Sequence, residues 1–486
     1  MTVRRPTLLI AVLLSAGLVA GCGSSGQAAP ATSANTSATE PSTATATESA
    51  TTTESAVPTD LPAPAQSPTT QPPTTQPPTS EPPAAAPPAA PAPAAPVPPG
   101  GLVTSADMVA ASAAVAGMSV ADQAGTVVMV SSADAVGTDL VGQLHLGGVI
   151  LMGSKGAIDG TDGGTPDEVA AVTARLQSQV PASQAGAPLL IATDQEYGLV
   201  TRLVNGFTDF PGAQELSSIS DTEAAAAQTR AVTAAAGAEL LAVGVNVDFA
   251  PDADVLPESG PSGIDDRSFG SDPERAGTLV AAAVQGYQSA GLAATIKHFP
   301  GIGRTATDTH KALPTLDSSC AEWNAVEAVP MRAGVDAGVA LVMTGHIALP
   351  AVGVEGVSSA LASAAVTDLL KGSGVEGCNG LNFAGVSVSD SFQMAPVVQN
   401  YGPAEAAWRG LAAGQDLVLM PVKPAEAVAG INAAVTDGSL PATRLQDAAT
   451  KVYALRLALA RSAQPSLDVV GSDAHAAIAA EARAAG

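Results

Sequence analysis

The sequence predicts an α/β domain built as a closed (β/α)8 barrel of the TIM type, and three observations lead to this fold class. Eight short apolar runs recur through the chain, Ala-rich stretches with helical character separate them, and about 365 residues remain for one domain after the N-terminal region. Strands that alternate with helices form parallel sheets through crossover connections, and eight such units make a barrel. The runs are Gly125–Val130, Gly147–Met152, Pro188–Thr193, Val245–Phe249, Leu292–Ile296, Leu341–Met343, Phe383–Val388 and Asp416–Met420. An open doubly wound sheet is the alternative, but the first run is not followed by a Gly-rich dinucleotide-binding pattern.

Residues 1–21 have the features of an export signal. Arg4 and Arg5 precede an apolar segment that is short for a membrane span, and small residues follow it. The sequence Val19-Ala20-Gly21-Cys22 resembles a bacterial lipobox, which implies lipidation of Cys22 and a membrane anchor. An ordinary secretory signal with an incidental cysteine is the alternative.

Residues 22–101 consist almost entirely of Ala, Thr, Ser and Pro. A segment with so few large apolar side chains cannot offset the entropy lost on ordering, so we expect a disordered linker that acts as a stalk. Its Thr/Pro composition also suits O-glycosylation.

The barrel is expected over residues 102–465. Helices are expected between the strands at Thr222–Ala242, Asp272–Ala290, Ala321–Ala337 and Ser359–Lys371, and a last helix around Pro441 to Ala463 closes the domain. Residues 466–486 are expected to form a loosely attached C-terminal tail.

Charge and cysteine content narrow the class of partner. A net charge of −25 argues against nucleic acid. In an exported protein, Cys320 and Cys378 form a plausible disulfide, with two buried free thiols as the alternative. We expect a monomer without a cofactor.

Five consecutive strands are followed by polar residues. These are Asp194-Gln195-Glu196, the acidic segment Asp248 to Asp254, Lys297-His298, Thr344-Gly345-His346 and Ser389-Asp390-Ser391. In a barrel the carboxyl ends of the strands share one rim, so the sequence predicts an active site there.

Asp390 directly follows a strand, where its carboxylate could attack the anomeric carbon of a sugar. The alternative is an Asp that caps the next helix. Asp308 and His310 are two positions apart, so in an extended loop they project to one side. A carboxylate beside an imidazole suits proton transfer, and a purely loop-stabilising hydrogen bond is the alternative.

Other polar residues at this rim are candidates for binding a polar ligand. Lys297 and His298 could donate hydrogen bonds to sugar hydroxyls, and Lys297 could instead pair with Asp248. Asp194, Arg202 and Arg267 could clamp the ligand, although each taken alone is more often part of a salt bridge. His346 is interpreted as a structural histidine. No metal is expected, because the acidic residues lack a recognised ligand spacing.

Five linked motifs together resemble glycoside hydrolase family 3, and in particular its single-barrel β-N-acetylglucosaminidases. The motifs are Asp194-Gln195-Glu196-Tyr197-Gly198, Asp266-Arg267-Ser268-Phe269-Gly270, Lys297-His298-Phe299-Pro300-Gly301, Asp308-Thr309-His310 and Ser389-Asp390. With the lipobox and the linker, the chain is similar to an actinobacterial cell-envelope lipoprotein of this group, placed at the extracytoplasmic face of the cell membrane.

The resemblance implies a role for each matched residue. Asp390 would be the nucleophile and His310 the acid/base, assisted by Asp308. Asp194, Arg202, Arg267, Lys297 and His298 would bind the N-acetylglucosamine ring. Three residues depart from the family pattern: Ile302, Tyr197 and Leu199. We expect all three in substrate-facing loops.

The sequence therefore predicts a retaining exo-β-N-acetylglucosaminidase that acts on a carbohydrate substrate, with peptidoglycan fragments as the expected source. A phosphorylase, or another β-glycosidase with the same site, is one alternative. A surface lipoprotein that binds sugar without turnover is the other.

Overall fold

The computed structural model describes residues 101–486 of the chain. The predicted signal peptide, Cys22 and the Pro-rich linker lie outside the described residues. No helix within residues 101–486 combines the length and the apolar character needed to cross a membrane.

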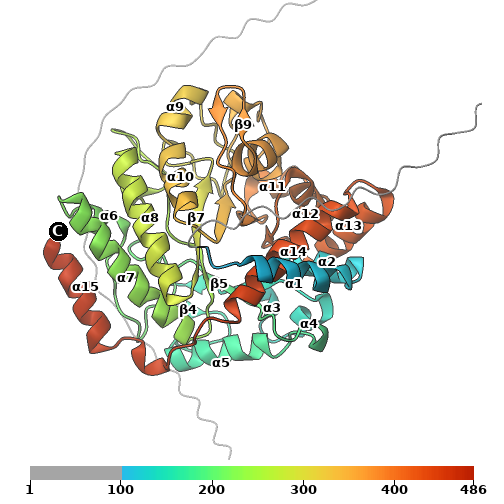
Figure 1. Cartoon of the computed structure of the whole chain (residues 1–486), viewed down its shortest axis with the longest axis horizontal. Helices are drawn as coiled ribbons and strands as arrows, with labels where there is room; N and C mark the ends of the chain where they lie inside the picture. Colours follow the sequence, from blue (N-terminus) through green and yellow to red (C-terminus); the bar gives the residue numbers. More distant parts are fainter. Residues whose placement is uncertain (1–100) are drawn as a thin grey trace, which may run out of the picture. The chain divides into compact units, whose positions relative to one another are not determined.

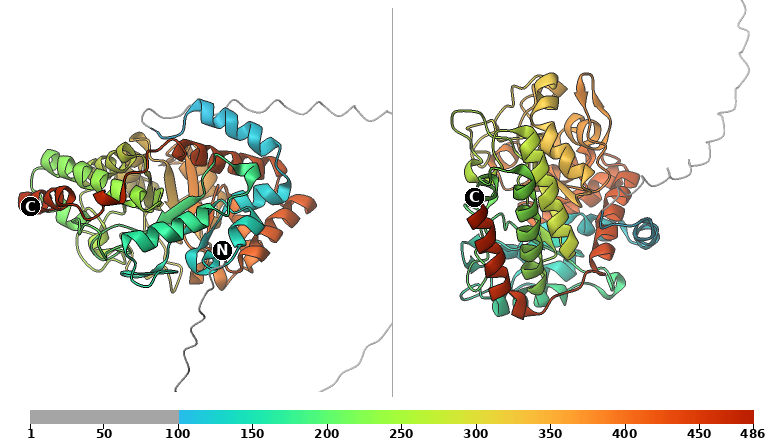
Figure 2. Two further views of the ribbon diagram at one scale, coloured as in Figure 1. Left: turned by 90° about the horizontal axis from the view of Figure 1, so that it is seen from below. Right: turned by 60° about the vertical axis from the view of Figure 1, so that its left-hand side comes forward.

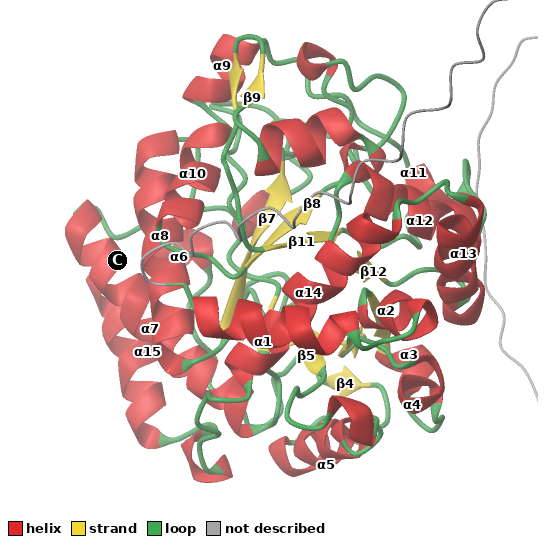
Figure 3. Cartoon of the chain, turned by 45° about the vertical axis from the view of Figure 1, so that its right-hand side comes forward, coloured by secondary structure: helices red, strands yellow, loops and turns green. Residues whose placement is uncertain are grey.

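Eight parallel strands form a closed barrel, which confirms the predicted fold class (Figures 1 and 3). In chain order the strands are β1 Val128–Ser131, β2 Gly148–Ile150, β5 Leu190–Thr193, β6 Val247–Asp248, β7 Ala293–Phe299, β8 Leu341–Thr344, β11 Val386–Ser389 and β12 Val418–Leu419. Each strand pairs with its neighbours in sequence, and β12 pairs with β1, with Val128 opposite Val418. A bridge between Val388 and Leu417 closes the ring between β11 and β12.

Helices surround the barrel on its outside (Figure 2). They are α1 Ser105–Ala116, α2 Val120–Thr126, α3 Ser132–Ala135, α4 Leu140–Leu144, α5 Pro166–Gln177, α6 Ala213–Ser217, α7 Thr222–Ala242, α8 Pro273–Ala290, α9 Cys320–Ala325, α10 Ala328–Asp336, α11 Ala395–Val398, α12 Pro403–Ala413, α13 Pro424–Asp437, α14 Ala442–Leu459 and α15 Asp473–Ala485. Two short antiparallel hairpins lie in the loops, β3 Gly153–Ser154 with β4 Ala157–Ile158 and β9 Gly374–Val375 with β10 Cys378–Asn379.

Local sequence signals set the ends of these helices. The side chain of Asp272 caps α8 by accepting hydrogen bonds from backbone N–H groups, and Pro273 follows in the first helical position. Gly291 ends α8 with φ of 95°, a left-handed conformation that costs glycine little.

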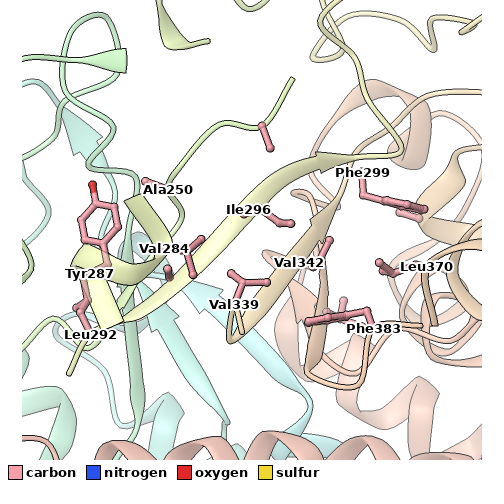
Figure 4. Packing of buried hydrophobic residues seen from close by; sticks show 14 of the residues in the cluster. Ala250, Val284, Tyr287, Leu292, Ile296, Phe299, Val339, Val342, Leu370 and Phe383 are labelled. Carbon is pink, nitrogen blue, oxygen red and sulfur yellow. The ribbon is translucent and has the colours of Figure 1, made fainter. Parts of the chain in front are cut away.

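The core has two layers that follow the alternation of side chains along each strand. Leu341 and Met343 of β8 point into the barrel and pack in the inner cluster, whereas Val342 points outward toward the helices. Figure 4 shows Val342 and Ile296 in this outer layer with Phe383 and Leu370. Every barrel strand is buried on both faces, so most of these strands appear as apolar runs, although β11 alternates Val with buried Ser.

The structure corrects two of the predicted helices. The stretch Ala321–Ala337 is divided into α9 and α10, because Val326 leaves helical geometry with φ −122° and ψ −80°. The adjacent Glu327 turns inward and pairs with Arg304. The stretch Ser359–Lys371 contains a short 3-10 turn and then a π-helix over Ala364–Lys371.

The structure also corrects the expectation of a loosely attached tail. Residues 473–485 form α15, which packs along α7. The anchor is His475, whose Nδ1 lies 2.9 Å from the buried carboxylate of Glu239. Nearer the active-site rim, Cys320 of α9 and Cys378 of β10 are joined by a disulfide.

Candidate active site

A pocket of about 350 Å³ opens at the carboxyl ends of the barrel strands, a size within the range of small-molecule sites. All eight of the residues predicted to act on or bind the sugar line it: Asp390, His310, Asp308, Asp194, Arg202, Arg267, Lys297 and His298. Apolar side chains complete the lining, namely Ile150, Met152, Met343, Leu419 and Met420. The structure therefore brings the whole predicted set together.

Asp390 lies immediately after β11, and its backbone fixes its position. The Asp390 N–H donates to the carbonyl of Thr344, and a carboxylate oxygen of Asp390 accepts the Ser391 N–H at 2.6 Å. The helix-capping alternative does not describe this residue, because the next helix begins at Ala395 with Met394 as its N-cap. The carboxylate instead lines the pocket.

His346 supports the segment that follows Asp390. Its Nε2 lies 2.9 Å from the Ser391 carbonyl, which can only accept, so Nε2 carries the proton. Its Nδ1 then accepts from the Ser358 hydroxyl at 2.8 Å. Burial lowers the pKa of His346 and favours this neutral form. The interpretation of His346 as structural agrees with these contacts.

His310 lies on the loop of residues 305–311, which we call the dyad loop. Its Nδ1 is 3.0 Å from Asp308 Oδ1, while Lys311 Nζ is 2.8 Å from the other carboxylate oxygen. The hydrogen bond from Lys311, with that from the His310 N–H, lowers the pKa of Asp308 to about 2. Because Nδ1 faces Asp308, Nε2 is the ring nitrogen that can exchange a proton with a ligand.

The dyad loop is exposed but is attached next to the Asp390 segment. The side chains of His310 and Asp308 are 76% and 43% exposed. The His310 carbonyl accepts the Ala395 N–H at 3.3 Å, five residues after Asp390. This bond holds the dyad loop against the loop that carries the candidate nucleophile.

A group of charged residues, of which Lys297 is buried and the others are partly buried, lines another part of the pocket, and we name it the ring-binding wall after its expected role: Asp194, Glu196, Arg202, Arg267 and Lys297. Lys297 Nζ lies 3.1 Å from Asp194 and 2.5 Å from Glu196. Arg202 pairs with the second oxygen of Asp194 at 3.1 Å. The suggested pairing of Lys297 with Asp248 is not observed, because Asp248 accepts the Gln195 N–H instead.

The electrostatics of the wall favour the charged forms. Burial would raise the pKa of Asp194, but the charges of Lys297 and Arg202 outweigh it and lower the pKa to about 2. Burial would lower the pKa of Lys297, yet Glu196 and Asp194 raise it. The wall therefore stays ionised at neutral pH.

Glu196 was not among the predicted site residues. It accepts two hydrogen bonds from Arg267, from Nε at 2.7 Å and from Nη2 at 3.0 Å, in addition to its contact with Lys297. The signal for it was present in the sequence, because Asp194 and Glu196 are two positions apart after a strand. The same spacing led to the pairing of Asp308 with His310.

The contacts of His298 fix its tautomer. Nδ1 lies 2.7 Å from Asp254, and Nε2 lies 3.2 Å from Arg267 Nη2. Since a guanidinium only donates, Nε2 accepts and Nδ1 carries the proton. In this tautomer both ring nitrogens of His298 already contact the protein, so the ring has no N–H left to donate to a sugar hydroxyl.

Asp252, Asp254 and His298 form a group whose ligand atoms lie within 4.8 Å of one another, so they could be considered for a metal. The oxygens of Asp254, however, already accept from the N–H groups of His298 and Ile302. Burial, and then the charge of Asp254, raise the pKa of Asp252 well above its ordinary value. Arg267 Nη2 lies 3.6 Å from Asp252 Oδ2, so the protein itself places a positive charge beside this group.

The three departures from the family pattern lie in different environments. Ile302 lines the pocket, as expected. Tyr197 instead is buried behind it and packs edge-on against Phe210, with ring centroids 5.4 Å apart. Leu199 is 64% exposed and is not a lining residue. Of the three only Ile302 lines the pocket itself, while Tyr197 and Leu199 lie in a loop whose residues Glu196 and Val200 line it.

The family model "Glycosyl hydrolase family 3 N terminal domain" matches residues 119–455, a segment that contains every lining residue of the pocket. The chain belongs to glycosyl hydrolase family 3. This match includes the five motifs on which the resemblance was based.

Curated proteins and solved structures that are similar to the chain carry related names. A "Beta-hexosaminidase" of Xanthomonas campestris pv. campestris is 34% identical over 255 residues, which cover 52% of this chain and 72% of that protein. "Beta-hexosaminidase A" of Pseudoalteromonas piscicida is 30% identical over 297 residues, which cover 59% of this chain and 47% of that protein, so the match spans about half of its length. The solved structure of a family 3 beta-N-acetylglucosaminidase from a Paenibacillus species is 32% identical with a TM-score of 0.67, covering 75% of this chain and 68% of that one.

Proposed function

We propose that this family 3 protein is a retaining exo-β-N-acetylglucosaminidase. The observation that carries the proposal is the shared pocket: Asp390, the His310–Asp308 pair and the ring-binding wall all line it. A carboxylate nucleophile, a group that can give and take a proton, and a set of sugar-binding charges are what double displacement requires.

In the first step a carboxylate oxygen of Asp390 attacks the anomeric carbon. The bond to the leaving oxygen breaks, and His310 Nε2 gives that oxygen a proton, so the aglycone leaves as an alcohol. The negative charge of Asp308 stabilises the imidazolium that supplies the proton. A covalent glycosyl-enzyme on Asp390 results.

In the second step neutral His310 removes a proton from water, and the resulting oxygen attacks the anomeric carbon. The ester bond to Asp390 breaks and the sugar leaves with its original anomeric configuration. His310 is protonated again and Asp390 is ionised, so the site returns to its starting state.

The wall offers the sugar both hydrogen-bond donors and hydrogen-bond acceptors. Lys297 has three donors, of which two face Asp194 and Glu196, and Arg267 uses Nε and Nη2 on Glu196 and His298. The third N–H of Lys297 and the Nη1 group of Arg267 can donate hydrogen bonds to hydroxyl groups of the sugar. The carboxylate of Asp194 can accept hydrogen bonds from sugar hydroxyls. Binding of this kind orients one ring at the end of a chain.

The names of the relatives support N-acetylglucosamine as the sugar that is released. Peptidoglycan fragments as its source, and a lipid anchor on Cys22 at the extracytoplasmic face of the cell membrane, follow from the sequence and are part of the proposal.

Trapping the covalent intermediate tests the proposal. The protein is incubated with a 2-fluoro or 5-fluoro glycosyl fluoride, and the adduct is located by peptide mass spectrometry. We expect one added sugar on Asp390 and none in Asp390→Ala, whereas Asp317→Ala, at an exposed position outside the pocket, labels like the wild type. An adduct on another carboxylate, or full hydrolysis of an aryl β-N-acetylglucosaminide by Asp390→Ala, contradicts the assignment.

Product analysis separates hydrolysis from phosphorolysis. We expect free N-acetylglucosamine both with and without phosphate. Formation of the sugar 1-phosphate when phosphate is present would identify the phosphorylase alternative instead.

The anchor is tested by fractionation of cells that express the full chain. The wild type should sediment with membranes, and Cys22→Ala should not. Retention of Cys22→Ala in the membrane fraction would contradict lipidation at that position.

A further inference from the structure

The C-terminal helix α15 lies beyond the residues that match the family model and packs on the outer helices of the barrel. It runs along α7 and also contacts α6, as Figures 1 and 2 show. Two connections lead from α15 to the segment that carries Glu196 and Arg202 of the ring-binding wall.

The first connection passes through the buried carboxylate of Glu239 in α7. One oxygen accepts from the Gly471 N–H at 3.1 Å and lies 2.9 Å from His475 Nδ1. The carboxylate also accepts from Thr208, from the backbone N–H at 3.0 Å and from the hydroxyl at 2.5 Å. Glu239 thus joins the start of α15 to residue 208 with charge-assisted hydrogen bonds, which are the stronger kind.

The second connection is a row of three rings. His475 of α15 packs against Phe210, with ring centroids 6.1 Å apart. Phe210 in turn packs edge-on against Tyr197 at 5.4 Å, and both aromatic side chains are buried. Arg483 adds a contact farther along α15, because its Nη1 donates to the Asp209 carbonyl at 2.8 Å.

Tyr197 stands at the base of a tight turn. Its φ is 64°, and the neighbouring Glu196 N–H donates to the Val200 carbonyl at 3.0 Å. The turn has Glu196 at one end and Arg202 at the other, both members of the ring-binding wall. Movement of the Tyr197 ring would therefore change the direction of Glu196, which holds both Lys297 and Arg267.

We propose that α15 is a positioning element of the sugar site, which acts through Phe210 and Tyr197 on the turn that carries Glu196 and Arg202. Residues of the wall are useful only when they are held in one geometry, and rigid packing behind them provides that support. None of the three rings lines the pocket, so their effect on binding is indirect. The kinetic part of the test rests on the proposed function.

Tyr197→Gly removes the ring without straining the backbone, because glycine adopts φ of 64° freely. We expect KM for an aryl β-N-acetylglucosaminide to rise roughly 3- to 30-fold, the range seen for residues that couple to a site without touching it. We expect kcat to change less than KM. Leu199→Gly is the matched control, since it alters an exposed side chain of the same turn and should leave KM unchanged.

His475→Ala tests the same route from its far end, with Glu481→Gln as control, because residue 481 is exposed and a glutamine can still accept the hydrogen bond from Gln228 of α7. The readout that needs no turnover is hydrogen exchange at the amides of Glu196, Arg202 and Leu203, which are bonded within the turn. We expect faster exchange at these amides in His475→Ala, and a double-mutant cycle with Tyr197→Gly in which the two changes in KM are not additive.

The outcomes separate the possibilities. If His475→Ala lowers only the melting temperature and leaves the exchange of these three amides and KM as in the wild type, α15 merely stabilises the fold and the proposal is wrong. If the wild type does not hydrolyse the aryl substrate but exchange still increases in His475→Ala, the proposed function fails and the positioning role stands.

Discussion

The ring-binding wall and the dyad loop line one pocket but are built in opposite ways. Lys297 of the wall is 2% exposed and contacts two carboxylates, whereas His310 is 76% exposed and its ring contacts only one. Groups that bind an uncharged sugar ring gain from a fixed, dry setting, while a group that must exchange protons with a leaving oxygen and with water needs access to both. In the proposed mechanism, sugar binding and proton transfer therefore belong to separate parts of the site.

One carboxylate from each part, Asp194 and Asp308, can be compared by its pKa. Asp194 in the wall and Asp308 in the dyad loop both have a pKa lowered to about 2. Asp194 reaches this value because two buried cations overcome its burial, and Asp308 because an exposed lysine and a backbone N–H donate to it. The same pKa therefore corresponds to a large contribution of ionised Asp194 to the stability of the fold and to a small contribution of ionised Asp308.

The largest effect is expected for the wall. Lys297→Met leaves Asp194 and Glu196 facing each other without their shared cation, and breaking a buried ion pair in this way costs about 3–5 kcal/mol of the free energy of unfolding. Urea denaturation monitored by circular dichroism measures it. Lys311→Met, in an exposed pair, is the matched control and should cost no more than about 0.5 kcal/mol. Equal losses in the two variants would contradict the comparison.

The next largest effect is expected in the dyad loop, and on kcat alone. His310→Gln removes the proton-transfer group, so kcat should fall by roughly 10²- to 10⁴-fold. Because the side chain is exposed, the free energy of unfolding should stay within about 0.5 kcal/mol of the wild type. Steady-state kinetics and denaturation on the same preparation provide both values. If this variant lost stability but kept its kcat, His310 would have a structural role and would not be the proton-transfer group.

A smaller effect should separate the two carboxylates by pH. Asp194 has a folded-state pKa of about 2, below its ordinary 3.8, so its ionisation contributes stability above about pH 4 that is lost as the pH falls through 2. The stability difference between wild type and Asp194→Asn should accordingly shrink over that window. Thermal melts at several pH values measure the difference. Asp308→Asn serves as control: the pKa of Asp308 is also lowered to about 2, but its side chain is 43% exposed and screened by solvent, so the trend should have the same direction and be much smaller.

The smallest effect is expected for Lys311→Met on activity. Lys311 donates to the carboxylate oxygen of Asp308 that does not face His310, so the dyad contact survives its loss. We expect kcat to change less than about threefold, as an exposed pair contributes at most about 1 kcal/mol. Raising the salt concentration should have a similar small effect on the wild type. A loss as large as that of His310→Gln would place Lys311 in the proton-transfer step.

The positions of the barrel strands could be predicted well because these strands are buried on both faces, so that most of them appear as apolar runs. Helix predictions failed where tertiary contacts override local preference. Glu327 turns inward to pair with Arg304, and α15 is held by the buried Glu239, a carboxylate within the 21-residue α7 that gives no local sign of its partner. Pairings across more than two hundred residues leave no trace in a local pattern.

The site, like the fold, could be predicted where local sequence pattern decides the structure and not where contacts between distant segments decide it. Polar residues at the carboxyl ends of parallel strands meet at one rim, so Asp390, Lys297 and Asp194 could be assigned to it from the sequence, although Lys297 proves to lie within β7. Glu196 could have been found by its spacing from Asp194. The tautomer of His298 could not have been predicted from the sequence, because it is set by Arg267 and Asp254, which come from two other loops.

By itself the sequence determined the barrel, the rim at which chemistry gathers and the residue types present there, since these depend on apolar periodicity and on the order of strands. The tertiary structure alone decided which charges are paired, which side chains are buried and which remain in water. Those properties come from contacts between segments far apart in the chain, and the ionisation and rigidity of the site depend on them.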